Sequence, residues 1–170
     1  VLAEYTGPLL PRQRGSLETA NERCEQATAA VRRMLTIIRT QEGATPEAPA
    51  QLISAVRQMH TQFSEEAARH DIAMEVETHI EEARVSMGEA ALSEALSALV
   101  SNALKYTPSH GRVLLYTSSA SGNDRIRVSV ADSGIGVPED DMQRIFEPFF
   151  RSTTASDTST PGVGLGLAFV

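Results

Sequence analysis

The stretch ALVSNALKYTP, residues 98–108, closes a predicted helix over 89–105 and decides how the rest of the chain is interpreted. Asn102 and Lys105 are three residues apart, so they are neighbours on one face of a largely apolar helix. An Asn carbonyl oxygen suits a hard cation such as Mg²⁺, and a Lys can neutralise phosphate charge. The pair indicates a ligand with both metal and anionic character. The alternative is a buried Asn satisfied by the backbone, beside a solvated Lys.

A second polar stretch, DSGIGVP over residues 132–138, follows a predicted strand directly. Asp132 would project from the strand end, where a fixed carboxylate can accept a hydrogen bond from an exocyclic amine such as that of adenine. Gly134 and Gly136 permit a close approach of the backbone and unusual φ angles. The alternative is a turn closed by an Asx-type hydrogen bond.

Two further segments lie near the end of the chain, IFEPFFR over 145–151 and PGVGLGL over 161–167. Arg151 opens a Ser/Thr-rich loop, and an Arg at such a hinge can close onto phosphate. Alternating glycines that lead into a helix expose backbone N–H groups to an anion. Their spacing matches neither a dinucleotide fingerprint nor a P-loop. The alternatives are a hydrophobic anchor under the loop, formed by the phenylalanines, and a glycine-rich packing turn.

The pattern around these segments predicts an α+β fold, in which helices cover one face of a mixed sheet. Apolar residues recur at helical spacing over 50–69 and 89–105, whereas other segments alternate as strands. The expected strands cover 72–77, 83–87, 112–118 and 125–130, with a hairpin turn at 121–124 and a short helix over 138–145. The helices and strands do not alternate regularly, which argues against a purely parallel sheet.

A separate helix is predicted over 16–40, ahead of a domain boundary at 41–49 that contains a glycine and two prolines. Its apolar residues repeat every seven positions at Leu17, Cys24, Val31 and Ile38, and a second set follows three positions later at Ala20, Ala27 and Met34. One helix cannot bury such a stripe alone, so we expect a helical bundle formed between chains. An ordinary amphipathic helix is the alternative. The predicted domains are residues 1–43 and 50–170.

Composition and charge exclude several classes of protein. The 170 residues carry a net charge of −7, so we expect no nucleic-acid partner, because that affinity comes mainly from Lys and Arg. Cys24 is the sole cysteine, which excludes an internal disulfide. No apolar run approaches the roughly 20 residues that span a bilayer. We therefore expect a soluble, cytoplasmic fragment of a longer protein, attached to a membrane only through parts outside this chain.

Four motifs, in this order, resemble those of one protein family. Residues 98–108 are similar to its N box, 132–136 to its first glycine box, 146–151 to its F box and 162–167 to its second glycine box. The family is the catalytic, ATP-binding domain of sensor histidine kinases, within the gyrase, chaperone and kinase (GHKL) ATPases. The resemblance covers about 50–170 and implies the Bergerat α/β sandwich. Helix 16–40 is similar to the second helix of the family's dimerisation and histidine-phosphotransfer bundle.

The resemblance implies a role for each matched residue. Asn102 would ligate Mg²⁺ and Lys105 would meet phosphate. Tyr106 would stack near adenine, whose amino group Asp132 would read. The other implied ATP-binding residues are Gly134, Ile135, Gly136, Arg151, Gly162, Gly164, Leu165, Gly166 and Leu167. Residues 152–161 would form the ATP lid. No catalytic base is assigned, because the base beside the phosphoacceptor histidine would lie outside this chain.

Several departures from the family pattern matter. Ala98 stands where a second Asn is usual, which leaves the Mg²⁺ site one polar group short, and Val163 replaces a common Ser or Thr. The phosphoacceptor motif is missing: His70-Asp71 matches two letters of it, but Glu75 stands where Pro belongs. His70 is therefore interpreted as a cation at a helix C-terminus. The chain also stops inside the helix after the last glycine box, so we expect a domain truncated at its C-terminus.

These observations predict an enzyme fragment, part of a sensor histidine kinase that acts in two-component signal transduction. It would bind Mg-ATP and transfer the γ-phosphoryl group to a histidine outside this chain, then to an aspartate of a response-regulator receiver domain. It would form a homodimer through the helical bundle. One alternative is a degenerate, non-catalytic dimerisation and signalling module, which Ala98 keeps open. Another is a GHKL ATPase clamp, although such enzymes use a carboxylate at the position of Ala98 to activate water.

Overall fold

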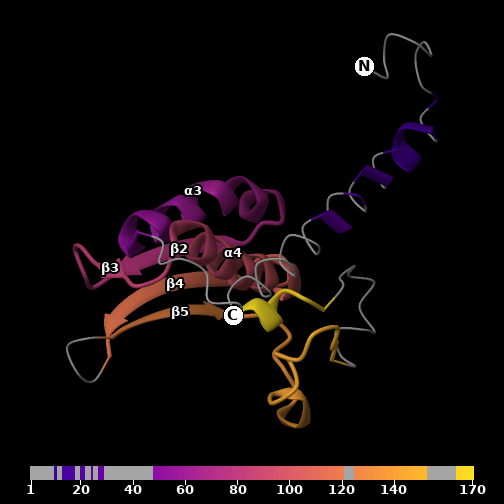
Figure 1. The fold of residues 1–170 in the computed structure, drawn as a ribbon. Helices are drawn as coiled ribbons and strands as arrows, with labels where there is room; N and C mark the ends of the chain where they lie inside the picture. The colour runs from indigo at the N-terminus through magenta and orange to yellow at the C-terminus, as the bar shows by residue number, and fades with distance from the viewer. Residues whose placement is uncertain are drawn as a thin grey trace.

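The computed structural model describes residues 10, 13–17, 20–21, 24, 27–28, 48–120, 125–152 and 164–170. Its elements, in chain order, are β1 (Ala50–Gln51), α3 (Leu52–Arg69), β2 (Ala73–Thr78), β3 (Arg84–Val85), α4 (Glu89–Tyr106), β4 (Arg112–Ser119) and β5 (Ile126–Asp132), followed by two 3-10 turns, Glu139–Asp141 and Leu167–Phe169. Figure 1 shows that α3 and α4 lie on the same face of the sheet that contains β2, β4 and β5.

The main sheet is mixed, with the strand order β2-β4-β5. β2 runs parallel to β4, from the pair Ala73–Arg112 to the pair Thr78–Thr117. β4 runs antiparallel to β5, so Asp132 at the end of β5 lies near the start of β4. β1 and β3 form a separate two-stranded sheet. The predicted α+β class, with helices on one face of a mixed sheet, is confirmed.

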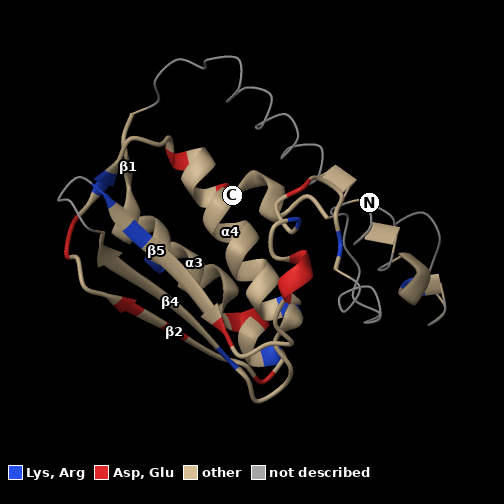
Figure 2. Ribbon diagram, turned by 90° about the horizontal axis from the view of Figure 1, so that it is seen from below, with Lys and Arg blue, Asp and Glu red and all other residues tan. Residues whose placement is uncertain are grey.

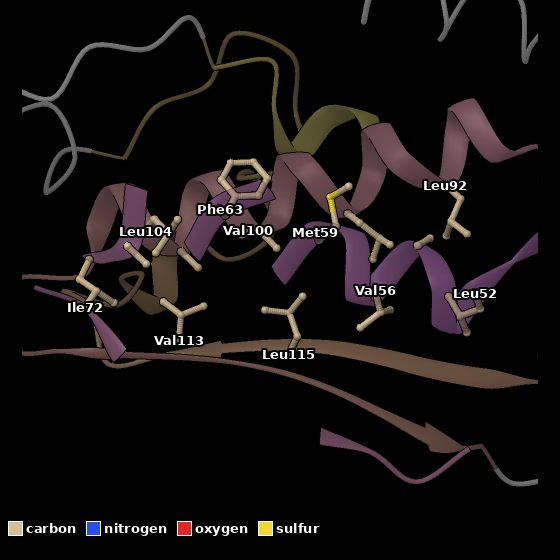
Figure 3. Packing of buried hydrophobic residues seen from close by; sticks show 14 of the residues in the cluster. Leu52, Val56, Met59, Phe63, Ile72, Leu92, Val100, Leu104, Val113 and Leu115 are labelled. Atoms are coloured by element: carbon tan, nitrogen blue, oxygen red, sulfur yellow. The ribbon is translucent and has the colours of Figure 1, made fainter. Parts of the chain in front are cut away.

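The first long helix, α3, forms because its apolar residues recur at intervals of three and four, which gathers them on one face. Its buried residues are Leu52, Ile53, Ala55, Val56, Met59, Phe63 and Ala67. Figure 3 shows this face above β4, whose Val113 and Leu115 are fully buried. Each large side chain contributes about 1.5–3 kcal/mol when it leaves water completely. The helix predicted over 50–69 is confirmed, except that its first two residues form β1.

The second long helix, α4, lies beside α3 and continues the same core. Its large buried side chains are Leu92, Leu96, Val100 and Leu104. Thr107 closes the helix, because its Oγ1 and its backbone N–H both donate to the carbonyl oxygen of Ala103, at 2.7 and 3.1 Å. Pro108 follows and cannot continue the helix. The buried stripe leaves Asn102 and Lys105 half-buried on the flank of the helix.

The segment after β5 differs from the prediction. The sequence predicts a short helix over 138–145, but the structure has a 3-10 turn, Glu139–Asp141, followed by further turns. The prediction is wrong because the segment has no face to bury: Val137, Met142 and Phe146 are each at least 40% exposed. Without that burial, a segment this short gains too little from backbone hydrogen bonds to hold an α-helix.

Two other elements are shorter than predicted. The strand expected over 83–87 is reduced to β3, which pairs with β1 through two residues. The helix expected after the last glycines is the 3-10 turn Leu167–Phe169. His70, by contrast, is the C-cap of α3, as the sequence indicates. Its backbone N–H donates to the carbonyl oxygens of Glu66 and Ala67.

The N-terminal helix falls mostly outside the described residues. Those positions of 16–40 that are described are helical, and Cys24 among them is exposed. Val31, Ile38 and the rest of the seam lie outside the described residues, so the bundle and the division into two domains stay predictions. The hairpin turn at 121–124 lies outside them as well. Within the described ranges, no helix has the length and apolar content to cross a membrane.

Candidate functional site

Asn102 lies against the glycine-rich end of the chain. A side chain on Gly166 would place its Cβ 3.6 Å from Nδ2 and 3.7 Å from Oδ1 of Asn102. These are ordinary van der Waals distances for the added Cβ, so about the width of one methyl group separates the Gly166 backbone from the Asn102 amide. The segment that resembles the second glycine box therefore lies close to the segment that resembles the N box. A longer side chain at Gly166 would cover the amide that the sequence singles out.

The C-terminal end of α4 is joined to the segment after β5. The backbone N–H of Ile135 donates to the carbonyl oxygen of Tyr106 at 3.2 Å. A Cβ on Gly134 would lie 2.6 Å from that same oxygen and 2.7 Å from Oδ1 of Asp132. Such distances are too short for any side chain, so glycine is required at this junction. The close approach predicted for Gly134 is therefore present in the structure.

Asp132 forms the turn that the sequence offers as an alternative interpretation. Its Oδ1 accepts a hydrogen bond from the backbone N–H of Gly134 at 2.9 Å. The side chain is nevertheless exposed at the end of β5, and a carboxylate has acceptor sites on both oxygens. The turn uses one carboxylate oxygen of Asp132. The other oxygen can still accept a hydrogen bond from an amine, so the two interpretations are compatible.

Ser133 and Gly111 were not identified from the sequence. The backbone N–H of Arg112 donates to Ser133 Oγ at 2.9 Å, and the backbone N–H of Ser133 donates to the carbonyl oxygen of Arg112 at 3.0 Å. A Cβ on Gly111 would lie 2.3 Å from the side chain of Thr107 and 2.9 Å from Ser133 Oγ. These contacts hold the strand end that carries Asp132. The sequence offers one indication of a role for Ser133, which is its position between Asp132 and the two glycines.

The F-box stretch is tied to the second glycine box. The backbone N–H of Phe149 donates to the carbonyl oxygen of Gly164 at 2.8 Å. Both residues adopt positive φ angles, 67° and 75°. Phe146 and Phe149 are 52% and 62% exposed, and Phe150 is half-buried. The interpretation of these phenylalanines as a buried anchor is therefore wrong for Phe146 and Phe149, because the turns of this segment leave both rings on the surface.

A hydrogen bond and a ring contact hold the residues on the two sides of Arg151. Ser152 Oγ donates to Oδ2 of Asp141 at 2.5 Å. The guanidinium of Arg144 lies 4.2 Å from the centre of the Phe150 ring. Arg151 itself is half-buried between these two anchored neighbours. Contacts of the preceding and the following residue therefore hold the backbone of Arg151 in position.

Charges of both signs gather at the end of α4, as Figure 2 shows. Lys105 Nζ lies 4.8 Å from the centre of the Tyr106 ring, a cation–π distance worth about 0.5–1 kcal/mol at an exposed position. Within the described part of the chain, no group of three or more His, Cys, Asp and Glu side chains could hold a metal ion by itself. The donor set still fits Mg²⁺ that arrives with phosphates, because Mg²⁺ takes one or two protein oxygens such as that of Asn102.

The remaining sequence-predicted residues are less closely joined to this centre. Ile135 is 50% exposed, and Gly136 has a φ of 70° with nothing near its Cβ position. Leu165 is buried and Leu167 half-buried. Gly162 lies outside the described residues. The structure thus brings together α4, the end of β5 and the last glycines, while the roles of the individual residues stay predictions.

Comparisons with known proteins agree with this geometry. Residues 87–170 match the family described as histidine kinase-, DNA gyrase B- and HSP90-like ATPase. The sensor-like histidine kinase SenX3 of Mycolicibacterium smegmatis is 44% identical over 87 residues, which cover 51% of this chain and 22% of SenX3. SenX3 of Mycobacterium tuberculosis H37Rv is 39% identical over 116 residues, or 65% of this chain and 28% of that protein. The chain therefore spans less than a third of these curated relatives.

A solved structure supports the same assignment. The catalytic domain of the histidine kinase ThkA is 30% identical, with a TM-score of 0.61, and the match covers 72% of this chain and 76% of that one. Sequence and fold therefore indicate the same family. This chain belongs to the histidine kinase-, DNA gyrase B- and HSP90-like ATPase family, among the sensor histidine kinases.

Proposed function

We propose that this domain binds Mg-ATP and, as the catalytic domain of a sensor histidine kinase, transfers the γ-phosphoryl group to a histidine outside this chain. The observation that carries the proposal is the closeness of Gly166 to the Asn102 amide, which a Cβ at Gly166 would touch, so that a candidate metal ligand lies near a glycine-rich turn. The match to an ATPase family supports ATP as the ligand. Full-length ShkA, 30% identical with a TM-score of 0.71, was solved in complex with AMPPNP, and the match covers 95% of this chain and 33% of ShkA.

The junction of α4 with the end of β5 would hold the base. The Gly134 N–H fixes Oδ1 of Asp132, so that Oδ2 would accept a hydrogen bond from the adenine amino group. Tyr106 would stack near the base. Its backbone carbonyl oxygen accepts a hydrogen bond from the Ile135 N–H, which holds this residue in position. Because Gly136 has open space around its Cβ position, its backbone would line the pocket without a side chain in the way.

The flank of α4 and the last glycines would hold the phosphates. Asn102 would ligate Mg²⁺ through its amide oxygen, and Lys105 and Arg151 would neutralise phosphate charge. Backbone N–H groups around Gly164 and Gly166 would donate to phosphate oxygens, as glycine-rich turns do elsewhere. Bound Mg²⁺ supplies further charge neutralisation on the phosphates. Gly162 belongs to this proposed set as well.

Catalysis in this proposal is positioning and charge neutralisation, which can supply most of the acceleration of a phosphoryl transfer. This chain would contribute no general base. The proposal includes three partners of this domain: an acceptor histidine, a second copy of the chain bound through helix 16–40, and the receiver domain of a response regulator. They are proposed and not observed, because the chain spans less than a third of its curated relatives.

The substitution Asp132→Asn tests the base pocket, and we expect it to abolish ATP binding in isothermal titration calorimetry. The new amide can still accept from the Gly134 N–H through its oxygen, but its NH₂ group then faces the adenine amine, so that two donors meet. The matched control is Glu75→Gln, the same change from acid to amide on an exposed residue of β2. If Asp132→Asn binds ATP as tightly as the parent, the base pocket is assigned wrongly.

A degenerate, non-catalytic signalling module is the second candidate, and Ala98 favours it. Ala98 is 2% exposed and lies one helical turn before Asn102, so a buried methyl group occupies a position that could have carried a second amide. Repeating the ATP titration with Mg²⁺ and with a chelator separates the two candidates. Affinity that depends on Mg²⁺ supports the kinase, and affinity that ignores Mg²⁺ supports the module. The ATPase clamp has less support, because a methyl group cannot activate water.

A further inference from the structure

We propose that Asp141 is a positioning residue for Arg151, acting through the hydrogen bond that its carboxylate accepts from Ser152. The inference rests on the proposed function, in which Arg151 contacts the phosphates of ATP. Asp141 itself would not touch the nucleotide. Its effect would be to hold the backbone from which the Arg151 guanidinium extends.

The bond between Ser152 and Asp141 is partly buried. Ser152 is 8% exposed, and its Oγ donates to Oδ2 of Asp141 at 2.5 Å although the two residues are eleven positions apart. A hydrogen bond to an ionised carboxylate is about twice as strong as one between neutral groups. The contact therefore fixes the residue that directly follows Arg151.

Asp141 presents its carboxylate from a well-defined turn. Its backbone N–H donates to the carbonyl oxygen of Pro138 at 2.9 Å. Its own carbonyl oxygen accepts from the backbone N–H groups of Arg144 and Ile145, at 2.8 and 3.1 Å. Three backbone hydrogen bonds thus hold the residue whose side chain holds Ser152.

The residues before Arg151 are anchored independently of Asp141. The backbone N–H of Phe150 donates to the carbonyl oxygen of Glu147 at 3.2 Å, and the Phe150 ring lies under the guanidinium of Arg144. Phe149 is tied to Gly164. Loss of the Asp141 carboxylate would therefore remove one hydrogen bond that holds the chain on one side of Arg151 and leave the other side in place. We expect a weaker phosphate contact rather than an unfolded domain.

The experiment compares the affinities for ATP and adenosine in the full chain, with ATP measured by calorimetry and adenosine by its competition against ATP. For Asp141→Ala and Ser152→Ala we expect the ATP affinity to fall about tenfold, the change that 1.4 kcal/mol produces. The adenosine affinity should stay at the parent value, since adenosine has no phosphates. The double variant should lose no more ATP affinity than either single variant, because both changes break the same bond.

Two further variants separate positioning from general destabilisation. Asp140→Ala removes an exposed carboxylate from the same 3-10 turn and should bind ATP like the parent. Asp141→Asn keeps an acceptor oxygen for Ser152 and should restore most of the ATP affinity lost in Asp141→Ala. If Asp141→Ala does not fold, the comparison of Ser152→Ala with Asp141→Asn gives the same test.

Distinct results overturn distinct statements. If Asp141→Ala and Ser152→Ala bind ATP as the parent does, or if adenosine affinity falls in proportion to ATP affinity, Asp141 does not position Arg151. If the parent chain itself binds neither ATP nor adenosine, the proposed function fails and this inference fails with it.

Discussion

At the scale of residues, Gly164 and Gly136 show two different reasons for a glycine. Both have positive φ angles, 75° and 70°. A Cβ on Gly164 would lie 2.6 Å from the carbonyl oxygen of Phe150 and 2.8 Å from the carbonyl carbon of Phe149. At Gly136 nothing lies within 4 Å of that position. Gly164 is therefore required by its backbone angle and by its neighbours, and Gly136 by its angle alone.

The pair of variants Gly164→Ala and Gly136→Ala separates these two effects. Each should lose about 1–2 kcal/mol for the left-handed backbone. Gly164→Ala should lose about 1–3 kcal/mol more, because a backbone carbonyl must move to make room for its Cβ. Urea denaturation followed by circular dichroism measures both free energies of unfolding. Equal losses in the two variants would contradict the close contact at Gly164.

How far residue roles can be predicted depends on how local the interaction is. The Asx-type turn of Asp132 involves a residue two positions away, and the sequence already offers it as an alternative. The bond of Ser133 with Arg112 depends on the register between β4 and β5, which sequence spacing does not reveal. The bond between Ser152 and Asp141 depends on turns that replace a predicted helix. Such contacts could be found only in the folded chain.

At the scale of elements, β4 is the central strand and its two faces differ. Val113, Leu115 and Thr117 are fully buried on the face toward the helices. Leu114 and Tyr116, which alternate with them, are half-buried on the other face. Thr117 is unusual among the buried residues, because in the described part of the chain its Oγ1 has no hydrogen-bond partner. β4 therefore carries one buried hydroxyl group that makes no hydrogen bond.

We expect Thr117→Val to stabilise the protein by about 1–3 kcal/mol, because it removes an unsatisfied buried hydroxyl and keeps the shape of the side chain. The control is Thr78→Val on β2, the direct neighbour of Thr117 in the parallel pair. Thr78 is half-buried, so its hydroxyl keeps access to water and its removal should change stability little. Thermal unfolding would detect the difference, and an unchanged or lower melting temperature for Thr117→Val would disprove the expectation.

The long helices and the strands could be predicted because burial imposes a period on their sequences. α3 and α4 follow a helical spacing, and β4 alternates between its two faces. The segment around Glu139–Asp141 has no buried face, so its sequence carries no comparable signal. Its shape follows from hydrogen bonds among its own turns.

At the scale of the whole molecule, the two helices and the main sheet share one core. Residues from α3, α4 and β4 belong to the same buried cluster, as Figure 3 shows. The candidate site lies at the end of α4, where the end of β5 and the last glycines approach it. The sequence indicated the motifs of the candidate site, but not the contacts between them. Those contacts join parts of the chain that are remote in sequence.

Loss of core volume should therefore weaken the whole domain at once. We expect Leu115→Ala to cost about 2–5 kcal/mol, because Leu115 is fully buried between the sheet and the helices. Leu114→Ala makes the same change one residue earlier, on the half-buried face of β4, and should cost clearly less. Urea denaturation of both variants compares the two faces of one strand. Similar costs would mean that the outer face contributes as much as the core.

Parallel pairing of β2 with β4 delays the folding of the nascent chain. β2 ends at Thr78, whereas its partner begins at Arg112, after all of α4 has been synthesised. Until β4 has left the ribosome, the apolar stripes of both helices have no sheet to cover. During that interval the uncovered apolar stripes make the growing polypeptide prone to aggregation.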